Sequence, residues 1–266
     1  WLIEVGYTGS NGKQLNRPPI DWNELSPEFV SLGNRLNQLV DNPFYAVAGI
    51  PSTSLLARPT IQLGQLLRPY PHFLRLEAFD RNGANSEYHG VTARVEKRFS
   101  HGLTLIGSYT TSKLMDDFSG IPGWQGAAPA RDRTRYDARR EWSLNEEDVS
   151  QRAVVSYTYE LPLGKGKAFA NGGGWTHWML GGWQVSGIHT FSTGIPIQVL
   201  GGTPYHAFGA GAQRPNSTGI SAAKSGRAQD RLNPWFDKAQ FTNPDPFTLG
   251  NLGRVLPDVR TDGLNQ

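Results

Sequence analysis

Apolar and polar residues alternate along five stretches of the chain, and this pattern predicts five β-strands. Each stretch is about as long as a tilted membrane-spanning strand, ~9–11 residues. The apolar positions are, in chain order, Trp1, Ile3, Val5 and Tyr7; Val91, Ala93, Val95 and Phe99; Leu103, Leu105, Gly107 and Tyr109; Ala153, Val155, Tyr157, Tyr159 and Leu161; and Trp183, Val185 and Phe191.

Two residues do not fit this alternation, because Lys97 and His189 fall at apolar positions. Lys97 is close to a strand end, where a long side chain can carry its ammonium into polar surroundings. His189 is nearer the middle of its strand, and we expect a bulge or a shift of parity near Gly187 to account for it.

The connections between the five stretches differ in length in an ordered way. Ser100-His101-Gly102 predicts a tight hairpin, and a Gly-rich link of intermediate length joins the last two stretches. The connections over 11–86, over 114–149 and after 194 are long. An up-and-down path brings all long connections to one end, as in outer-membrane barrels, whereas a soluble sandwich has no reason for this asymmetry. The predicted fold is all-β, an antiparallel up-and-down meander from a large transmembrane β-barrel with long extracellular loops.

Aromatic and charged residues are distributed over the two faces of the predicted sheet. Six apolar-face aromatics fall at two levels, as interface girdles do; ordinary strand propensity is the alternative. They are Tyr7, Tyr109 and Phe191 near the long loops, and Phe99, Tyr159 and Trp183 near the short turns. The opposite face carries polar residues that we expect to line the lumen and pair across strands. These are Glu4, Arg94, Glu96, Arg98, Arg152 and Glu160.

One short helix is predicted in the first long loop. Ser26 can act as its N-cap, and Pro27 suits the first helical position. Its apolar face would consist of Phe29, Leu32, Leu36, Leu39 and Val40.

The composition narrows the possible classes of protein. Of the 266 residues, 11% are aromatic, which argues against disorder, while 31 Gly and 18 Pro favour turns and loops. The absence of cysteine excludes disulfides and thiolate sites. The net charge of +3 has no basic run, so we expect no nucleic-acid partner. No apolar stretch reaches the ~20 residues of a spanning helix.

Candidate catalytic and metal-binding residues are few. Asp116-Asp117 and Glu146-Glu147-Asp148 are acidic clusters that glycoside hydrolysis or calcium binding could use. Neither has a supporting motif, and we expect both clusters to be solvated surface. The segment 164–167, GKGK, lacks the spacing of a phosphate-binding loop and reads as a basic turn at the periplasmic rim. We therefore predict no enzyme activity, cofactor or metal site.

A charged, aromatic-flanked segment in the second long loop is the candidate ligand-binding site. Arginine binds carboxylate and phosphate in a bidentate manner, and aromatic surfaces commonly stack on sugars or peptides. A self-paired, solvated loop is the alternative. The candidates are Trp124, Arg131, Arg133, Tyr136, Arg139, Arg140 and Trp142.

Local segments spread over nearly the whole chain resemble the barrel of TonB-dependent receptor-like proteins of the Oar-like kind, in which a carboxypeptidase-regulatory-like domain precedes the plug. The segments are EVGYTGS (4–10), NPFY (42–45), QLLRPYP (65–71), SEYH (86–89), EKRFS (96–100), SYTTSK (108–113), YELP (159–162), GKGK (164–167), LGGWQ (180–184), SG (186–187) and QRPN (213–216). The resemblance implies a barrel of roughly 22 strands closed by a plug. Residues 1–266 are then expected to be a partial barrel domain, without the signal peptide, plug and closing C-terminal strand.

The resemblance also implies a location and a function. We expect an outer-membrane receptor that contacts outer-membrane lipid, takes up an unidentified ligand, and is driven by the TonB complex through the plug. Oligosaccharides and peptides fit the aromatic loops slightly better than siderophores. A structural or adhesive surface barrel is the main alternative, and a soluble sugar-binding or sugar-cleaving β-protein is a third.

Overall fold

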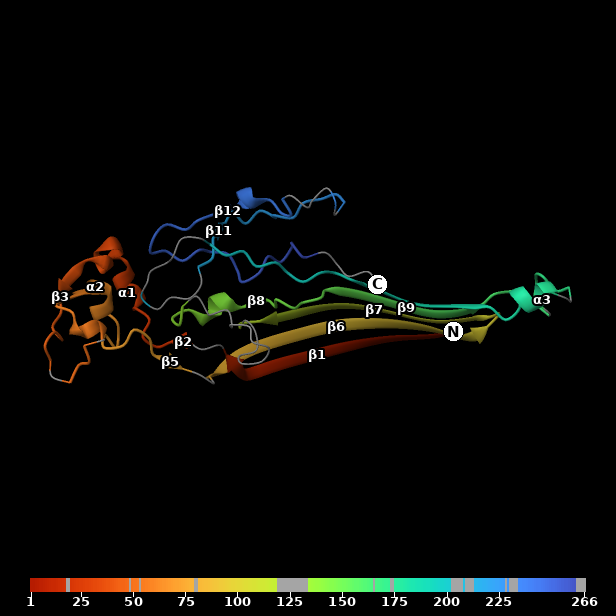
Figure 1. The fold of residues 1–266 in the computed structure, drawn as a ribbon, viewed down its shortest axis with the longest axis horizontal. Helices are drawn as coiled ribbons and strands as arrows, with labels where there is room; N and C mark the ends of the chain where they lie inside the picture. Colours follow the sequence, from red (N-terminus) through yellow and green to blue (C-terminus); the bar gives the residue numbers. More distant parts are fainter. Residues whose placement is uncertain are drawn as a thin grey trace.

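The computed structural model describes residues 1–17, 20–47, 49–52, 54–78, 81–118, 134–164, 166–172, 175–201, 208, 213–227, 229 and 234–261. Its main feature is one twisted antiparallel sheet of long strands (Figure 1). The strands are β1 (Leu2–Arg17), β6 (Arg81–Ser100), β7 (Leu103–Asp116), β9 (Gln151–Glu160) and β10 (Gln184–Ser192). They pair in the order β1-β6-β7-β9-β10, and the short β8 (Ser143–Leu144) adds to β7. The predicted antiparallel meander is confirmed as an open sheet whose described edges are β1 and β10.

The register of the strands gives the sheet one apolar and one polar face. Residues paired across neighbouring strands point to the same face of the sheet, and successive side chains of one strand point to opposite faces. One row on the apolar face is Ile3, Val95, Gly107, Val155 and His189; the adjacent row on the polar face is Glu4, Arg94, Ser108, Val154 and Thr190. The alternation in the sequence thus translates directly into two faces.

The two longest strands continue beyond the apolar part of the sheet. Past Tyr7 and Val91, the former apolar positions become polar, with Gly9 opposite His89 and Asn11 opposite Glu87. β1 has 16 residues and β6 has 20, more than a tilted strand needs to cross a bilayer. The strands therefore carry their connections away from the apolar band.

The connections gather at two ends of the sheet, which we call the turn end and the loop end (Figure 1). The turn end holds the β6–β7 hairpin, where His101 and Gly102 adopt positive φ of 52° and 77°. It also holds the β9–β10 connection with helix α3 (Trp175–Leu180). The connections after β1, β7 and β10 lie at the loop end, which confirms the asymmetry predicted from the sequence.

The first connection folds as a small unit of short elements. They are β2 (Ile20–Asp21), α1 (Pro27–Val30), η1 (Gly33–Asn37), β3 (Leu39–Asp41), η2 (Leu55–Ala57), β4 (Thr60–Gln62), α2 (Leu63–Leu66) and β5 (Glu77–Ala78). β2 pairs with β5 and β3 with β4. Leu25, Leu36 and Phe208 form its buried core, so the last connection also contributes to it.

The single helix predicted in this loop is wrong in its extent. A helix does begin at Pro27, but it ends at Val30. Gly33, with a φ of 53°, begins a 3₁₀ turn, and strand β3 follows. Ser26 makes no side-chain capping bond. Leu36 is buried as expected, whereas Leu39 is 68% exposed because it belongs to β3.

The last connection contains β11 (Asn216–Ser217), η5 (Lys238–Gln240) and β12 (Phe241–Thr242). Ala222, Leu252, Leu256 and Val259 form its buried core. The middle connection contains η3 (Ala138–Glu141) and β8. None of the helices within the described ranges is long and apolar enough to cross a bilayer.

The bulge expected near Gly187 is absent from β10. Pairing with β9 runs without a shift from Gln184 to Ser192. His189 lies on the apolar face, where its ring stacks on Tyr157 (centroids 5.8 Å apart, planes at 12°) and approaches Phe191. The histidine is therefore accommodated in a row of rings rather than by a change of register.

Lys97 lies at the turn end of the apolar face. Its Nζ is 5.7 Å from the ring centroid of Trp1, a cation–π distance. The lysine is thus placed next to an aromatic ring at the margin of the apolar band.

Candidate ligand-binding surface

The candidate ligand-binding residues lie around η3, at the loop end of the sheet. Tyr136 and Trp142 are 40% and 41% exposed, and Arg139 and Arg140 are also exposed. Arg140 Nε donates to Asp137 Oδ2 at 2.6 Å, which leaves Arg139 as the freer of the two cations. Trp124, Arg131 and Arg133 lie outside the described residues.

Tyr136 and its neighbour Arg135 attach this segment to the first connection. The Tyr136 hydroxyl donates to the backbone oxygen of Glu24 at 3.2 Å, and the Arg135 backbone N–H donates to Glu24 Oε2 at 2.7 Å. The Arg135 guanidinium carbon lies 4.3 Å from the ring centroid of Tyr136 and 5.5 Å from that of Trp22. Tyr136 thus has a structural role in addition to its exposed surface.

Glu24 is a buried carboxylate at the junction of these two connections. Burial raises its pKa above the ordinary 4.5, while hydrogen bonds from Arg135 and Thr134 act in the opposite direction. Burial at this junction therefore disfavours the ionised form of the Glu24 carboxyl.

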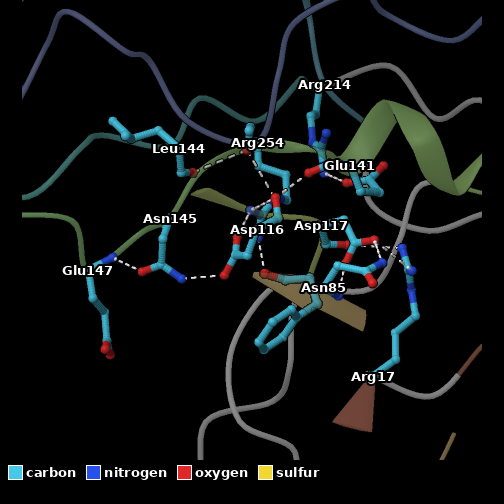
Figure 2. A network of polar contacts seen from close by, with 12 residues as sticks. Arg17, Asn85, Asp116, Asp117, Glu141, Leu144, Asn145, Glu147, Arg214 and Arg254 are labelled. Carbon is cyan, nitrogen blue, oxygen red and sulfur yellow. Dashed lines mark hydrogen bonds and ion pairs between the residues drawn. The ribbon is translucent and has the colours of Figure 1, made fainter. Parts of the chain in front are cut away.

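The expectation that the acidic clusters are solvated is wrong for most of their members, and Figure 2 shows two of these, Asp116 and Asp117, paired with Arg254 and Arg17. Asp116, Asp117 and Asp148 are buried, as is Glu141, and only Glu147 is exposed. Each buried carboxylate has an arginine partner from a distant part of the chain. The pairs are Asp116–Arg254, Asp117–Arg17 (3.4 Å), Glu141–Arg214 (2.5 Å) and Asp148–Arg260 (2.6 Å).

Arg254 is the most extensively bonded of these arginines. Its Nε donates to the Glu141 backbone oxygen at 2.9 Å and to Ser143 Oγ at 3.1 Å. Its Nη2 donates to the carboxylate and to the backbone oxygen of Asp116, and its Nη1 donates to the Phe118 oxygen. Arg254 is only 3% exposed, and all three of its guanidinium nitrogens donate hydrogen bonds. It therefore holds neighbouring segments together and does not offer a ligand contact.

The arginines of the last connection hold it against the ends of β7, β8 and β9, and a cavity of about 550 Å³ lies between them. We call it the loop cavity. Its apolar lining is Met115, Leu144, Leu252, Val255 and Pro257. Its polar lining is Ser112, Lys113, Ser143, Asp148, Ser150 and Arg260. Mostly apolar walls with a few convergent polar groups are typical of small-ligand sites.

The polar face of the sheet carries a chain of ion pairs near the turn end. Arg94 lies 3.7 Å from Glu4 on the neighbouring strand and 3.2 Å from Glu96, and Arg98 lies 3.6 Å from Glu96. Glu160 pairs with Lys167 of the β9–β10 connection at 3.0 Å. Arg152 is exposed and lies opposite Thr110 and Ser192.

The six aromatics predicted for the apolar face lie at two levels of the sheet, although a register shift between Lys97 and Ser100 interrupts the alternation at Phe99. At the loop end, Tyr109 and Phe191 both pair with Ala153, and Tyr7 pairs with Val91. At the turn end, Phe99 is near the end of β6, Tyr159 pairs with Leu103, and Trp183 immediately precedes β10. That these levels mark the two membrane interfaces remains a prediction.

Sequence reasoning did not identify Arg214, Arg254 and Arg260. Each is a single arginine in a Gly- and Pro-rich stretch, 73–138 residues away from its carboxylate partner. Only the repeated occurrence of isolated cations in the last loop and isolated anions near strand ends could have pointed to them. Among the described residues, no three His, Asp or Glu side chains are grouped as a metal site would require.

Comparison with protein families agrees with this architecture. The family model described as an outer membrane beta barrel domain matches residues 1–266. Neither the curated protein sequences nor the solved structures contain a significant match to the chain. The open meander, with its apolar face and one-sided long loops, is thus consistent with an outer-membrane barrel domain. The chain belongs to the outer membrane β-barrel domain family, and its location is the outer membrane.

Proposed function

We propose that this chain is the ligand-capturing barrel section of a TonB-dependent outer-membrane receptor. The observation that carries the proposal is the packing at the loop end, where buried ion pairs hold the last connection to the middle connection and to the end of β7, beside the loop cavity. Rigidly held loops on a barrel are suited to binding, because little conformational entropy is lost when a ligand arrives. The proposal is for a binding and transport protein and not for an enzyme.

The ion pairs on the polar face of the sheet support the proposal that a captured ligand passes through the interior of the barrel. Glu4, Arg94 and Glu96 form adjacent ion pairs on the face that a closed barrel would turn inward. Such a face favours a hydrated lumen, which receptors of this kind close with a plug. Coupling of the plug to TonB follows from the resemblance and belongs to the proposal.

The ligand class is proposed to be an oligosaccharide or a peptide. Exposed Tyr136 and Trp142 offer flat surfaces for stacking, and Arg139 offers a bidentate donor to carboxylate or phosphate. The loop cavity adds an apolar recess with serine hydroxyls at its wall. Together they fit an amphiphilic ligand better than a bare ion.

Uptake by cells that produce the full-length protein tests the proposal. Oligosaccharide and peptide mixtures are supplied, and internalised material is measured with and without an uncoupler of the proton gradient. We expect accumulation to depend on the gradient and to fall in a Trp142→Ala variant, with Tyr45→Ala, an exposed aromatic of the first connection, as the control. Uptake that is insensitive to the uncoupler contradicts TonB coupling.

Adhesion is the second candidate, favoured by one observation on the first connection. Its side chains include several large, exposed apolar groups. They are Leu39, Tyr45, Val47, Tyr70, Phe73 and Leu74. Exposed apolar patches commonly mark interaction sites. Cells that bind to surfaces or to one another through this unit, without internalising any supplied ligand, would support adhesion over uptake.

A further inference from the structure

The connection between β9 and β10 at the turn end carries a group of exposed aromatic side chains. Trp175 is 72% exposed, Trp178 85% and Phe169 63%, and Met179 in the same helix is 51% exposed. Three large rings in one short connection are unusual for a surface in water, where each exposes apolar area unfavourably. Burial against something outside the described chain would remove this penalty.

Helix α3 is joined to the apolar face of the sheet through Trp183. The Trp183 indole Nε1 donates to the Met179 backbone oxygen at 2.8 Å, and the Trp183 oxygen accepts from the Leu161 N–H at 2.9 Å. Trp183 itself is 60% exposed and shares the parity of Val185 on the apolar face. Helix α3 lies beyond the turn end of the strands (Figure 1), next in the chain to this residue.

The charge of the connection is of one sign. Residues 161–183 contain two lysines, Lys165 and Lys167, and no aspartate or glutamate. The nearest carboxylate, Glu160, is on the polar face and pairs with Lys167. Positive charge and absence of acidic groups suit a surface of anionic phospholipid headgroups.

We propose that the β9–β10 connection is an interfacial membrane anchor, which inserts Trp175 and Trp178 into the phospholipid leaflet at the turn end of the barrel. Continuity with the lipid-facing surface at Trp183 identifies lipid as the occupant. Indole rings settle at the headgroup level, with the apolar body in the acyl region and the N–H toward water. The anchor would fix the height and tilt of this part of the barrel in the bilayer.

Fluorescence quenching tests the proposal. The chain contains no cysteine, so a thiol introduced by Trp178→Cys can be labelled with an environment-sensitive dye, after replacement of any cysteines elsewhere in the full-length protein. Because Trp178 is 85% exposed, its replacement does not threaten the fold. The labelled protein is placed in vesicles of phosphatidylethanolamine and phosphatidylglycerol, some with brominated acyl chains.

Brominated lipid is expected to reduce the emission of the dye at position 178 by about half, and aqueous iodide to have little effect. Val185→Cys on the lipid-facing surface serves as the membrane-embedded reference, and Ile220→Cys in the last connection as the aqueous one. Quenching by iodide at the level of Ile220→Cys would overturn the proposal. So would protection from both quenchers, which would indicate that protein covers the connection.

Discussion

At the residue scale, the loop end depends on arginines that cross from one connection to another. Arg254 and Asp116 each have a side chain that is 1% exposed, and the pair joins the last connection to the end of β7. A buried pair of this kind adds little compared with an apolar contact, but removal of one partner leaves an uncompensated charge. Replacing Arg254 alone and replacing both Arg254 and Asp116 should therefore change the stability of the last connection by different amounts.

Arg254→Leu is expected to lower the free energy of local unfolding of residues 252–261 by about 3–5 kcal/mol, because Asp116 is left buried without its cation. Hydrogen exchange at the Leu256 amide, which donates to Ile197 at 2.9 Å, should accelerate roughly a hundred-fold or more. Arg227→Leu, an exposed arginine of the same connection, is the control. Unchanged exchange in Arg254→Leu, or no recovery upon adding Asp116→Asn, would show that the pair does not hold the connection.

Glu24 provides a prediction about pH. Its folded-state pKa is raised by burial, so its contribution to stability is fully present below the unfolded value and is lost as pH rises through the folded pKa. Wild-type protein should therefore lose stability relative to Glu24→Gln as the pH rises from acidic values to neutral. Exchange at the Leu25 amide, corrected for intrinsic rates, measures this difference. A parallel pH dependence in both proteins, with exposed Glu28→Gln as the control, would contradict the assignment.

At the element scale, the tight β6–β7 hairpin depends on backbone conformation. Gly102 has a φ of 77°, and a Cβ at this position would lie 3.0 Å from the Glu160 backbone oxygen. The turn is therefore restricted both by strain within the residue and by the neighbouring strand.

Gly102→Ala should lower the unfolding free energy by about 1–2 kcal/mol, because a non-glycine residue is strained at positive φ. Urea unfolding of the full-length protein in detergent measures the change. Gly107→Ala in the adjoining strand is the matched control, since nothing lies within 4 Å of its added Cβ. Equal stability of the two variants would mean that the turn is not restricted at Gly102.

The elements also show which parts of the structure the sequence could predict. Strands and their faces follow from local alternation, and the hairpin follows from His101-Gly102, because both depend on residues close in sequence. The sequence predicted too long a helix in the first loop, since Gly33 adopts a positive φ where the helix was expected to continue. The Arg254–Asp116 contact spans 138 residues of sequence and leaves no local pattern. The sequence indicated candidate residues around η3, whose ligand-binding role stays a prediction, but not the arginines that hold these loops together.

At the scale of the whole molecule, the sheet separates two chemically different ends. The turn end has a hairpin and an aromatic connection, while the loop end carries three folded connections and the loop cavity (Figure 1). Family membership places the chain in the outer membrane. We predict that the loop end faces the outside of the cell and that the turn end faces the periplasm.

Thiol labelling of intact cells tests this orientation most directly. Single cysteines are introduced by Ser225→Cys in the last connection and by Gly172→Cys in the β9–β10 connection, both exposed positions in a chain without native cysteine. A maleimide too large to cross the outer membrane should label Ser225→Cys on intact cells and Gly172→Cys only after permeabilisation. Labelling of Gly172→Cys on intact cells, with Ser225→Cys protected, would contradict this orientation of the barrel.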